Sequence, residues 1–275
     1  MIRNLLMALA CLAGAFSAGQ AAWAADPVTE ELWIENGNRR IYGVQASPAE
    51  SEGRLPVVVI AHGFNGSHEF GCNYFDTLCA LGYRCYAFDF PCGALHSRSD
   101  ANTMNMSVRD EVSDLEAIVR HFRAQADVDS TSIVVVGESQ GGLVAALAAA
   151  EQPQLMSRLV LVYPALCIPD NWNSRYARES DIPDTTRVWN VPLGRRFFRE
   201  LRGMEVYPKI GRYAGPVLIV HGDKDPVVPL DYSVRAAETY PDAVLHVVRG
   251  AGHGFGGAAW EEALGQVAAF LRRAE

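Results

Sequence analysis

Ser139 lies in the segment of this 275-residue chain that most suggests chemistry, the sequence G-E-S-Q-G-G at residues 137–142. An apolar run at 133–136 precedes it and an alanine-rich run at 143–150 follows it, which predicts a strand that turns sharply into a helix. In such a G-x-S-x-G turn, small residues allow a strained backbone that presents the serine hydroxyl, and the helix directs its N-terminus toward a developing oxyanion. We therefore interpret Ser139 as a candidate nucleophile.

A serine hydroxyl needs a base, and the base needs a third group that orients it. His253 follows a predicted strand in the glycine-rich sequence R-G-A-G-H-G-F. Two aspartates in H-G-D-K-D-P compete for the third role. Asp225 precedes a proline, lies deeper in the loop and is favoured, whereas Asp223 could equally form the turn. The order Ser139, Asp225, His253, each after a strand, predicts a catalytic triad.

An oxyanion hole needs two backbone N–H groups. One is expected from Gln140, the residue after the candidate nucleophile, and the other from Phe64 in the sequence H-G-F-N-G that follows an apolar strand. His62 precedes this second donor, and we expect it to make structural hydrogen bonds and not to act as the catalytic base.

The elements that must position these residues alternate along the chain. Segments 29–35 and 40–46 predict an antiparallel entry hairpin. Later strands are predicted at 57–60, 84–88, 133–136, 159–162, 217–220 and 243–248, and helices at 68–81, 106–125, 140–151, 230–240 and 258–273. This alternation predicts an α/β fold with a mainly parallel sheet and helices on both faces.

Residues 165–213 interrupt the alternation and are predicted to be an insertion, a cap, on a single domain of residues 25–275. The cap contains seven aromatic residues, and nine lysines and arginines against six acids. Such a cap could hold a ring-bearing acyl group or an anionic substrate. The alternative is that its aromatic side chains simply pack the insertion onto the sheet.

The N-terminus has the pattern of a secretory signal peptide: Arg3, an apolar run at 5–16 and A-W-A at 22–24. We expect cleavage after Ala24 and export to the periplasm or outside the cell, with no stable membrane insertion because the run is too short to span a bilayer. The sequence L-A-C at 9–11 leaves a lipoprotein signal as an alternative.

The formal net charge is −8, so a nucleic-acid partner is not expected. No Cys/His zinc spacing occurs, and no metal site is predicted. The predicted mature chain keeps five cysteines, an odd number, and either a bridge within residues 72–92 or burial as small apolar side chains would account for them. They are Cys72, Cys79, Cys85, Cys92 and Cys167.

Together, H-G-F at 62–64, the Ser139 turn, the Asp225 loop and G-x-G-H-x-F around His253 resemble the α/β-hydrolase superfamily of serine hydrolases, and more closely its cinnamoyl/feruloyl-type esterases. The resemblance covers nearly the whole predicted mature chain. It implies an α/β-hydrolase fold with a cap over the pocket, a Ser-His-Asp triad, a small-molecule ester as substrate and no cofactor.

The resemblance also nominates Asp170 of the cap for contact with a phenolic hydroxyl, and Trp172 and Trp189 are the aromatic candidates for the pocket. The chain departs from the subgroup at Glu138, where histidine is usual. Glu138 either faces the site, where it would disfavour anionic intermediates, or faces away and anchors the turn.

The leading hypothesis is an exported serine carboxylesterase that forms an acyl-enzyme, with cinnamoyl or feruloyl esters as candidate substrates. An exported serine peptidase of the same fold is the first alternative, although the chain lacks room for a second large domain. A non-catalytic binding protein is the second, and the complete set of candidate residues argues against it. The sequence leaves the oligomeric state open.

Overall fold

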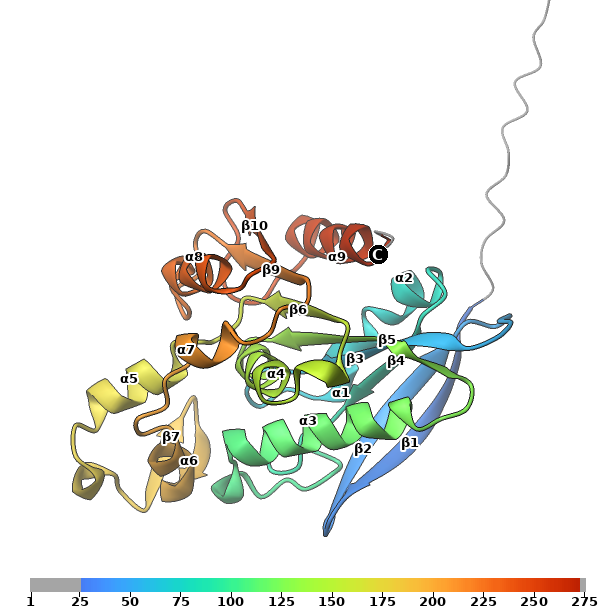
Figure 1. Cartoon of the computed structure of the whole chain (residues 1–275). Helices are drawn as coiled ribbons and strands as arrows, with labels where there is room; N and C mark the ends of the chain where they lie inside the picture. The colour runs from blue at the N-terminus through green and yellow to red at the C-terminus, as the bar shows by residue number, and fades with distance from the viewer. Residues whose placement is uncertain (1–25, 273–275) are drawn as a thin grey trace, which may run out of the picture.

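An eight-stranded sheet runs through the centre of the molecule in the computed structural model, which describes residues 26–272 (Figure 1). The order is β1-β2-β4-β3-β5-β6-β9-β10; β2 runs antiparallel to both neighbours and the other pairs are parallel. The strands are β1 (Val28–Asn36), β2 (Arg39–Ser47), β3 (Leu55–Ala61), β4 (Arg84–Phe88), β5 (Val128–Glu138), β6 (Arg158–Val162), β9 (Val217–Gly222) and β10 (Ala243–Val248). The predicted signal peptide, with Cys11, lies outside the described residues.

The central strands are buried on both faces, as their continuous apolar runs predict. Val57 and Val59 of β3 pack in the core on one side of the sheet, and Val58 and Ile60 pack in the core on the other. All four side chains are at most 1% exposed. Because side chains alternate along a strand, one short strand joins the two helical layers into a single domain.

Helices cover both faces of this sheet (Figure 1). The helices α3 (Val108–Arg123), α4 (Gln140–Glu151), α7 (Tyr207–Ile210) and α8 (Leu230–Thr239) lie on one face. The other face carries α1 (His68–Cys72), α2 (Phe75–Cys79) and α9 (Ala258–Leu271). The predicted α/β fold is therefore confirmed.

The single helix predicted over residues 68–81 is wrong in one respect, because the chain forms two short helices there. The break falls between Cys72 and Phe75, where Tyr74 is 1% exposed and donates a hydrogen bond to Glu138 on β5. Gly71 packs so closely on β4 that an added Cβ would lie 2.6 Å from the Cβ of Ala87. This tight packing and the buried Tyr74 redirect the chain, and neither feature is visible in the local apolar pattern.

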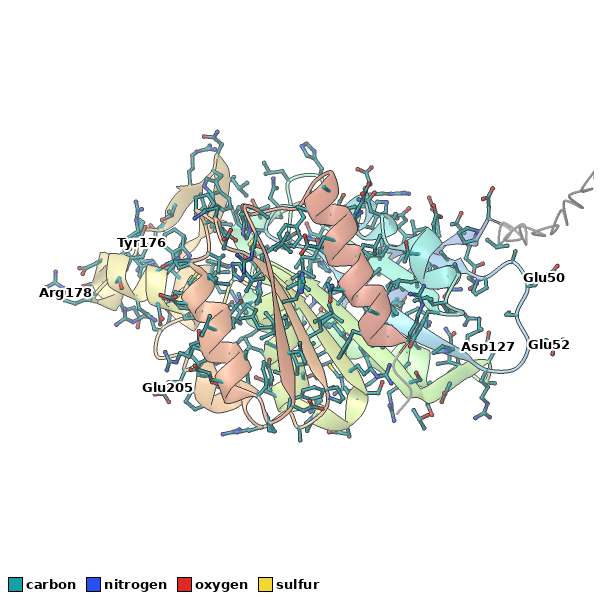
Figure 2. All side chains as sticks on the ribbon, turned by 90° about the horizontal axis from the view of Figure 1, so that it is seen from above. Glu50, Glu52, Asp127, Tyr176, Arg178 and Glu205 are labelled. Carbon is teal, nitrogen blue, oxygen red and sulfur yellow. The ribbon has the colours of Figure 1, made fainter. Side chains whose placement is uncertain are left out.

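The segment between β6 and β9 forms the cap, at one end of the sheet. In Figure 2 its residues Tyr176 and Arg178 lie at the opposite end of the molecule from Glu50 and Glu52. Besides short helices it contains a β-hairpin that the sequence did not predict. The elements of the cap are α5 (Ile168–Arg175), the 3-10 helix η3 (Glu179–Asp181), β7 (Thr185–Val188), β8 (Val191–Gly194), α6 (Arg195–Glu200) and α7, and β7 and β8 form the hairpin.

Two further features concern the whole described chain. All five cysteines in residues 26–272 have free thiols, and every one except Cys72 is buried. No helix in that part of the chain combines the length and apolar character needed to cross a bilayer.

Candidate active site

Ser139 stands at the turn between β5 and α4, with φ 50° and ψ −115°. A positive φ is strained for a serine, and the surrounding structure must hold it there. The Ser139 N–H donates to the Val162 carbonyl of β6, and the Ser139 carbonyl accepts from Gly142, Leu143 and Ala165. These four backbone bonds hold the turn, so that the half-buried hydroxyl stands at the carboxyl edge of the parallel strands.

His253 lies in the loop after β10 and faces this hydroxyl. Its Nε2 is 2.9 Å from Ser139 Oγ, and its Nδ1 is 2.7 Å from Asp225 Oδ2. The side chain of Asp225 is fully buried and that of His253 is 17% exposed. The structure thus brings the three predicted residues into one hydrogen-bonded chain, in which an imidazole could take a proton from the hydroxyl while a carboxylate holds the ring.

Asp225 is held as a carboxylate by its surroundings. Burial alone would raise its pKa, but backbone N–H groups of Val228 and Val227 and the His253 ring donate to it and together lower the pKa below its usual value. The competing Asp223 has a different contact, because its Oδ1 accepts from the Gly250 N–H at 2.6 Å and joins the two loops. The geometry therefore pairs His253 with Asp225.

His221, at the end of β9, is a second histidine beside the same carboxylate. Its Nε2 lies 3.2 Å from Asp225 Oδ2 and 3.0 Å from the Val228 carbonyl, and its Nδ1 lies 2.6 Å from Ser233 Oγ. The ring is fully buried, and this burial lowers its pKa. Sequence reasoning assigned no role to His221, although its place at a strand end two residues before Asp223 was a usable signal.

Phe64 and Gln140 flank Ser139, as the sequence predicts for the two N–H donors. Neither backbone N–H has a hydrogen-bond acceptor within residues 26–272. The Phe64 loop approaches closely, because a Cβ added at Gly63 would lie 3.0 Å from Ser139 Cβ. Two uncommitted N–H groups beside a hydroxyl are the arrangement that stabilises a tetrahedral oxyanion.

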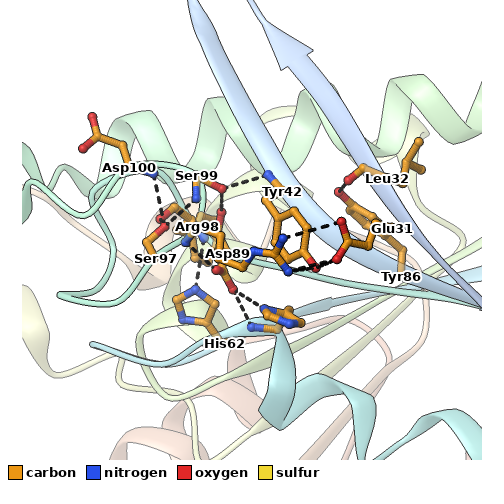
Figure 3. A network of polar contacts seen from close by, with 12 residues as sticks. Glu31, Leu32, Tyr42, His62, Tyr86, Asp89, Ser97, Arg98, Ser99 and Asp100 are labelled. Carbon is orange, nitrogen blue, oxygen red and sulfur yellow. Dashed lines mark hydrogen bonds and ion pairs between the residues drawn. The ribbon is translucent and has the colours of Figure 1, made fainter.

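A polar network that includes the buried side chains of His62 and Asp89 lies next to the Phe64 loop in the chain (Figure 3). His62 Nδ1 donates to the Gly63 carbonyl at 2.7 Å, and Nε2 accepts from the Phe90 N–H at 3.0 Å. Burial lowers the pKa of His62, in keeping with an Nε2 that accepts this hydrogen bond and carries no proton. The neighbouring Asp89 accepts from the backbone and ring of His68 at 2.7 and 2.8 Å. His62 therefore makes structural hydrogen bonds, as expected, and lies away from the proton relay.

Glu111 of α3 binds the side chain of Gln140 in the interior of the protein. The Gln140 side-chain amide donates to both Glu111 carboxylate oxygens, at 3.0 and 2.9 Å, and both residues are at most 3% exposed. Burial raises the pKa of Glu111 to about 8, although the Gln140 hydrogen bond opposes that rise. Sequence reasoning missed Glu111, because an acid in a helix is ordinary until the tertiary structure shows its burial.

Glu138 faces away from the site. It is 3% exposed, and its Oε1 accepts a 2.5 Å hydrogen bond from the Tyr74 hydroxyl. Burial raises its pKa to about 8, with the Tyr74 hydrogen bond opposing the rise. Of the two readings that the sequence left open, the structure favours an anchor that ties β5 to the break between α1 and α2.

A cavity of about 680 Å³ opens above Ser139 between the sheet and the cap. Trp172 and Trp189 both line it, as predicted, whereas Asp170 does not. Asp170 is exposed on α5 and accepts a hydrogen bond from the Tyr232 hydroxyl at 3.0 Å. The lining residues are Phe64, Ser139, Gln140, Ala165, Cys167, Ile168, Asn171, Trp172, Arg175, Arg187, Val188, Trp189, Leu193, Phe197, Pro226, Val227 and Val228.

Trp189 reaches this cavity from the tip of the β7–β8 hairpin. Trp189 and Asn190 both have positive φ, 46° and 68°, which forms the tight turn. The indole is 67% exposed and packs edge-on against Phe64, with ring centroids 5.7 Å apart. Among the cap aromatics, four are buried and pack the insertion; they are Phe197, Phe198, Tyr207 and Tyr213. Packing of the insertion therefore accounts for these four side chains, of which Phe197 also lines the cavity, and the binding of a ring-bearing group by the cap stays a prediction.

The described part of the chain contains no group of three or more His, Cys, Asp or Glu side chains arranged to hold a metal ion. The candidate site consists of Ser139, His253 and Asp225 with two backbone donors. Such a constellation supports nucleophilic acyl transfer.

Comparisons with known proteins identify solved structures that are similar to this chain over most of its length. Est1E from Butyrivibrio proteoclasticus, solved with ferulic acid bound, is 25% identical, with a TM-score of 0.76 over 88% of this chain and 96% of Est1E. DcsB in complex with a substrate analogue is 19% identical, with a TM-score of 0.73 over 89% of this chain and 98% of DcsB. Alpha/beta hydrolase domain-containing protein 10 from mouse is 18% identical, with a TM-score of 0.68 over 88% of this chain and 96% of the mouse protein.

The last two similarities concern the fold alone. No curated protein sequence matches the chain significantly. A sequence profile of the alpha/beta hydrolase family matches residues 58–270, which include every candidate site residue. The resemblance inferred from the motifs is therefore confirmed at the level of the family, and this chain belongs to the alpha/beta hydrolase family.

Proposed function

We propose that this hydrolase is an exported serine carboxylesterase that cleaves small esters through an acyl-enzyme. The observation that carries the proposal is the hydrogen-bonded chain from Ser139 Oγ through His253 to Asp225 at the floor of a cavity. Export rests on the N-terminal sequence, which lies outside the described residues.

In the first half of the reaction, Ser139 Oγ attacks the ester carbonyl carbon while its proton passes to His253 Nε2. The Asp225 carboxylate accepts the Nδ1 hydrogen bond and stabilises the imidazolium. The N–H groups of Phe64 and Gln140 donate to the oxyanion. Collapse of the tetrahedral intermediate breaks the ester bond, and His253 transfers its proton to the departing alcohol.

In the second half, a water molecule gives a proton to His253 and attacks the Ser139 ester. The same two N–H groups stabilise the second oxyanion. Return of the proton to Ser139 Oγ releases the carboxylic acid and restores the resting site. No group beyond these residues and water is needed to balance the reaction.

Aromatic esters of the cinnamoyl or feruloyl type are the proposed substrates. The support is the aromatic lining of the cavity by Phe64, Trp172, Trp189 and Phe197, together with the similarity to Est1E, whose structure contains ferulic acid. Aromatic walls favour a ring-bearing ligand because they bury its apolar faces.

Covalent labelling by an alkyl fluorophosphonate tests the nucleophile. We expect the label on Ser139, and we expect it to disappear in Ser139→Ala but not in Ser51→Ala, a change in an exposed loop. Asp225→Asn should lower kcat by roughly 10³- to 10⁴-fold because the His253 ring loses its orienting carboxylate. A folded wild-type protein that stays unlabelled would contradict the proposal.

A second assay separates the proposed esterase from the peptidase and binding-protein alternatives. Wild-type protein is offered 4-nitrophenyl acyl esters and aminoacyl 4-nitroanilides. Turnover of the esters alone supports the esterase, and turnover that favours the anilides would support the peptidase. Absence of both, with a function unaffected by Ser139→Ala, would support a binding protein.

A further inference from the structure

Six of the eight arginines of the cap form two groups that differ in their surroundings. Four of them form ion pairs with carboxylates: Arg178 with Asp181, Arg195 with Asp184, Arg196 with Asp110 and Arg199 with Glu179. Arg175 and Arg187 both line the cavity above Ser139, and neither has a carboxylate within ion-pair distance in residues 26–272. Arg202 and Arg212 also form no ion pair within residues 26–272, but neither lines the cavity, and Arg202 donates to two backbone carbonyls. Both arginines that face the cavity are therefore without a counter-ion there.

The contacts of these two guanidinium groups leave most of their N–H donors free. Arg187 donates one hydrogen bond, from Nη1 to the Asn190 carbonyl in the turn of the hairpin, at 2.9 Å. The guanidinium carbon of Arg175 lies 5.8 Å from the ring centroids of Trp172 and Tyr176. Because an arginine carries five N–H donors, most of the donors of both side chains are free to bind a ligand. Their neighbours are a carbonyl and two aromatic rings, which position the guanidinium groups without neutralising their charge.

The rest of the lining leaves this positive charge uncompensated. Of the described residues that line the cavity, none is an aspartate or a glutamate, although the whole chain has a net charge of −8. The acids nearest in sequence to Arg175 are Glu179 and Asp170, and both lie outside the lining: Glu179 pairs with Arg199, and Asp170 has Tyr232 as its partner. Asp225 is fully buried behind the His253 ring. An acidic protein thus keeps a cationic binding cavity.

We propose that Arg175 and Arg187 bind an ionised acid group of the substrate at the cap end of the cavity. The substrate class is then an aromatic ester with a second, ionised acid group remote from the scissile carbonyl. This inference deepens the proposed esterase function and rests on it. The guanidinium fork binds carboxylate or phosphate oxygens through paired N–H donors, and such charge-assisted bonds strengthen when the ligand displaces water.

The two arginines come from different cap elements, α5 and β7, and the Trp189 turn follows the second of them directly. An anionic group bound between them would contact both the helix and the hairpin of the cap. The aromatic ring of the substrate would then lie against Trp172, Trp189 or Phe197. The site would select substrates by the charge of the group bound at the two arginines, while the ester carbonyl is positioned at Ser139.

Matched ester pairs test the charge preference. On the acyl side, methyl 4-carboxycinnamate is compared with methyl 4-carbamoylcinnamate, which has the same shape and no charge. On the alcohol side, cinnamoyl glycolate is compared with cinnamoyl glycolamide. We expect wild-type kcat/KM to favour the charged member of one pair by about tenfold or more, since one charge-assisted hydrogen bond is worth about a factor of ten.

Arg175→Gln and Arg187→Gln should each reduce this ratio by about tenfold while turnover of the uncharged ester changes little. Arg212→Gln is the matched control, because Arg212 is an exposed cap arginine that does not line the cavity. It makes the same change in net charge and should leave the ratio unchanged. A wild-type ratio near one in both pairs, or an equal loss in all three variants, would overturn the inference.

Equilibrium binding keeps this test separate from the proposed chemistry. The same four esters are titrated into Ser139→Ala protein, and Trp fluorescence reports binding in the cavity. Tighter binding of the charged esters that depends on Arg175 and Arg187 supports the inference even if no ester is hydrolysed, in which case only the esterase proposal fails. Equal binding of charged and uncharged esters overturns the inference even if both are hydrolysed.

Discussion

The Gln140 side-chain amide donates hydrogen bonds to both carboxylate oxygens of Glu111, and both side chains are buried. Gln140 also carries one of the two backbone N–H groups beside Ser139. The contact therefore connects a buried carboxyl group on α3 with the first residue of α4 and with the proposed oxyanion hole.

Glu111 makes stability depend on pH in a definite direction. Burial raises its pKa from 4.5 to about 8 in the folded state. Between these values the folded protein holds a proton that the unfolded chain has lost, so the free energy of unfolding falls as the pH rises from about 4.5 to about 8. Glu111→Gln keeps the shape without the titration, and it should be more stable relative to wild type at pH 9 than at pH 5.

Urea unfolding at both pH values measures this difference. Glu50→Gln, a change in an exposed loop, serves as the control and should follow wild type at both. Glu111→Ala should instead cost about 1–3 kcal/mol at pH 5, because the buried Gln140 amide loses its acceptor. A stability difference between Glu111→Gln and wild type that is the same at pH 5 and pH 9 would refute the assignment of this titration to Glu111.

Glu138 should limit activity on the alkaline side. Burial raises its pKa to about 8, so the neutral acid that stands beside Ser139 becomes a carboxylate above that pH. Although its carboxyl group faces Tyr74 and not the cavity, Glu138 is buried and adjoins the nucleophile in the chain, so a negative charge there acts on the oxyanion through the protein interior. We therefore expect kcat for an uncharged ester to fall as the pH passes about 8. Glu138→Gln should remove this fall.

Tyr74→Phe changes the other partner of the same contact. The Tyr74 hydroxyl donates to Glu138 and lowers the pKa of that carboxyl, so its removal should move the fall in kcat to higher pH. Glu111→Gln is measured in parallel because the pKa of Glu111 is also about 8. An alkaline profile that Glu138→Gln leaves unchanged would show that another group is responsible.

Trp189 should affect substrate choice without affecting stability. Its indole is 67% exposed and contacts Phe64 at the mouth of the cavity. Trp189→Ala should raise KM for methyl ferulate several-fold because a stacked ring is worth about 0.5–1.5 kcal/mol, whereas kcat for a 4-nitrophenyl acetate should change little. Trp33→Ala on β1, the exposed control, should alter neither value. An equal loss of kcat/KM for both esters would argue against a role of Trp189 in selecting substrates with an aromatic ring.

Gly141 should tolerate no side chain, because the first turn of α4 packs directly on the end of β3. An added Cβ would lie 2.3 Å from the Ala61 carbonyl oxygen and 2.5 Å from that of His62. Gly141→Ala should therefore shift the Phe64 loop away from Ser139, with a stability cost of about 1–3 kcal/mol and a large loss of activity.

Gly265 on α9 is the matched control. It is exposed, and a Cβ there meets no atom within 4 Å. Gly265→Ala should raise stability by about 0.5–1 kcal/mol because alanine favours a helix interior, with activity unchanged. Chemical unfolding and ester turnover measured on both variants check the pair, and a fully active Gly141→Ala would contradict the close packing.

The sequence by itself determined the features that depend on local pattern. Apolar runs and their spacing predicted the parallel sheet, and glycines around a serine between a strand and a helix predicted the Ser139 turn. Because parallel strands end at one edge of a sheet, residues after successive strands were expected to meet, and Asp225 and His253 do. Such features are encoded within a few residues, or by the order of elements along the chain.

Only the tertiary structure decided what depends on burial and on contacts distant in sequence. It turned Glu138 toward Tyr74, broke the predicted helix over residues 68–81, and placed Glu111 against Gln140. It left Asp170 outside the cavity and put Arg175 and Arg187 into it without counter-ions. A residue's type states which charges and hydrogen bonds it can carry, but the packing of other elements against it sets its exposure, its partners and its pKa.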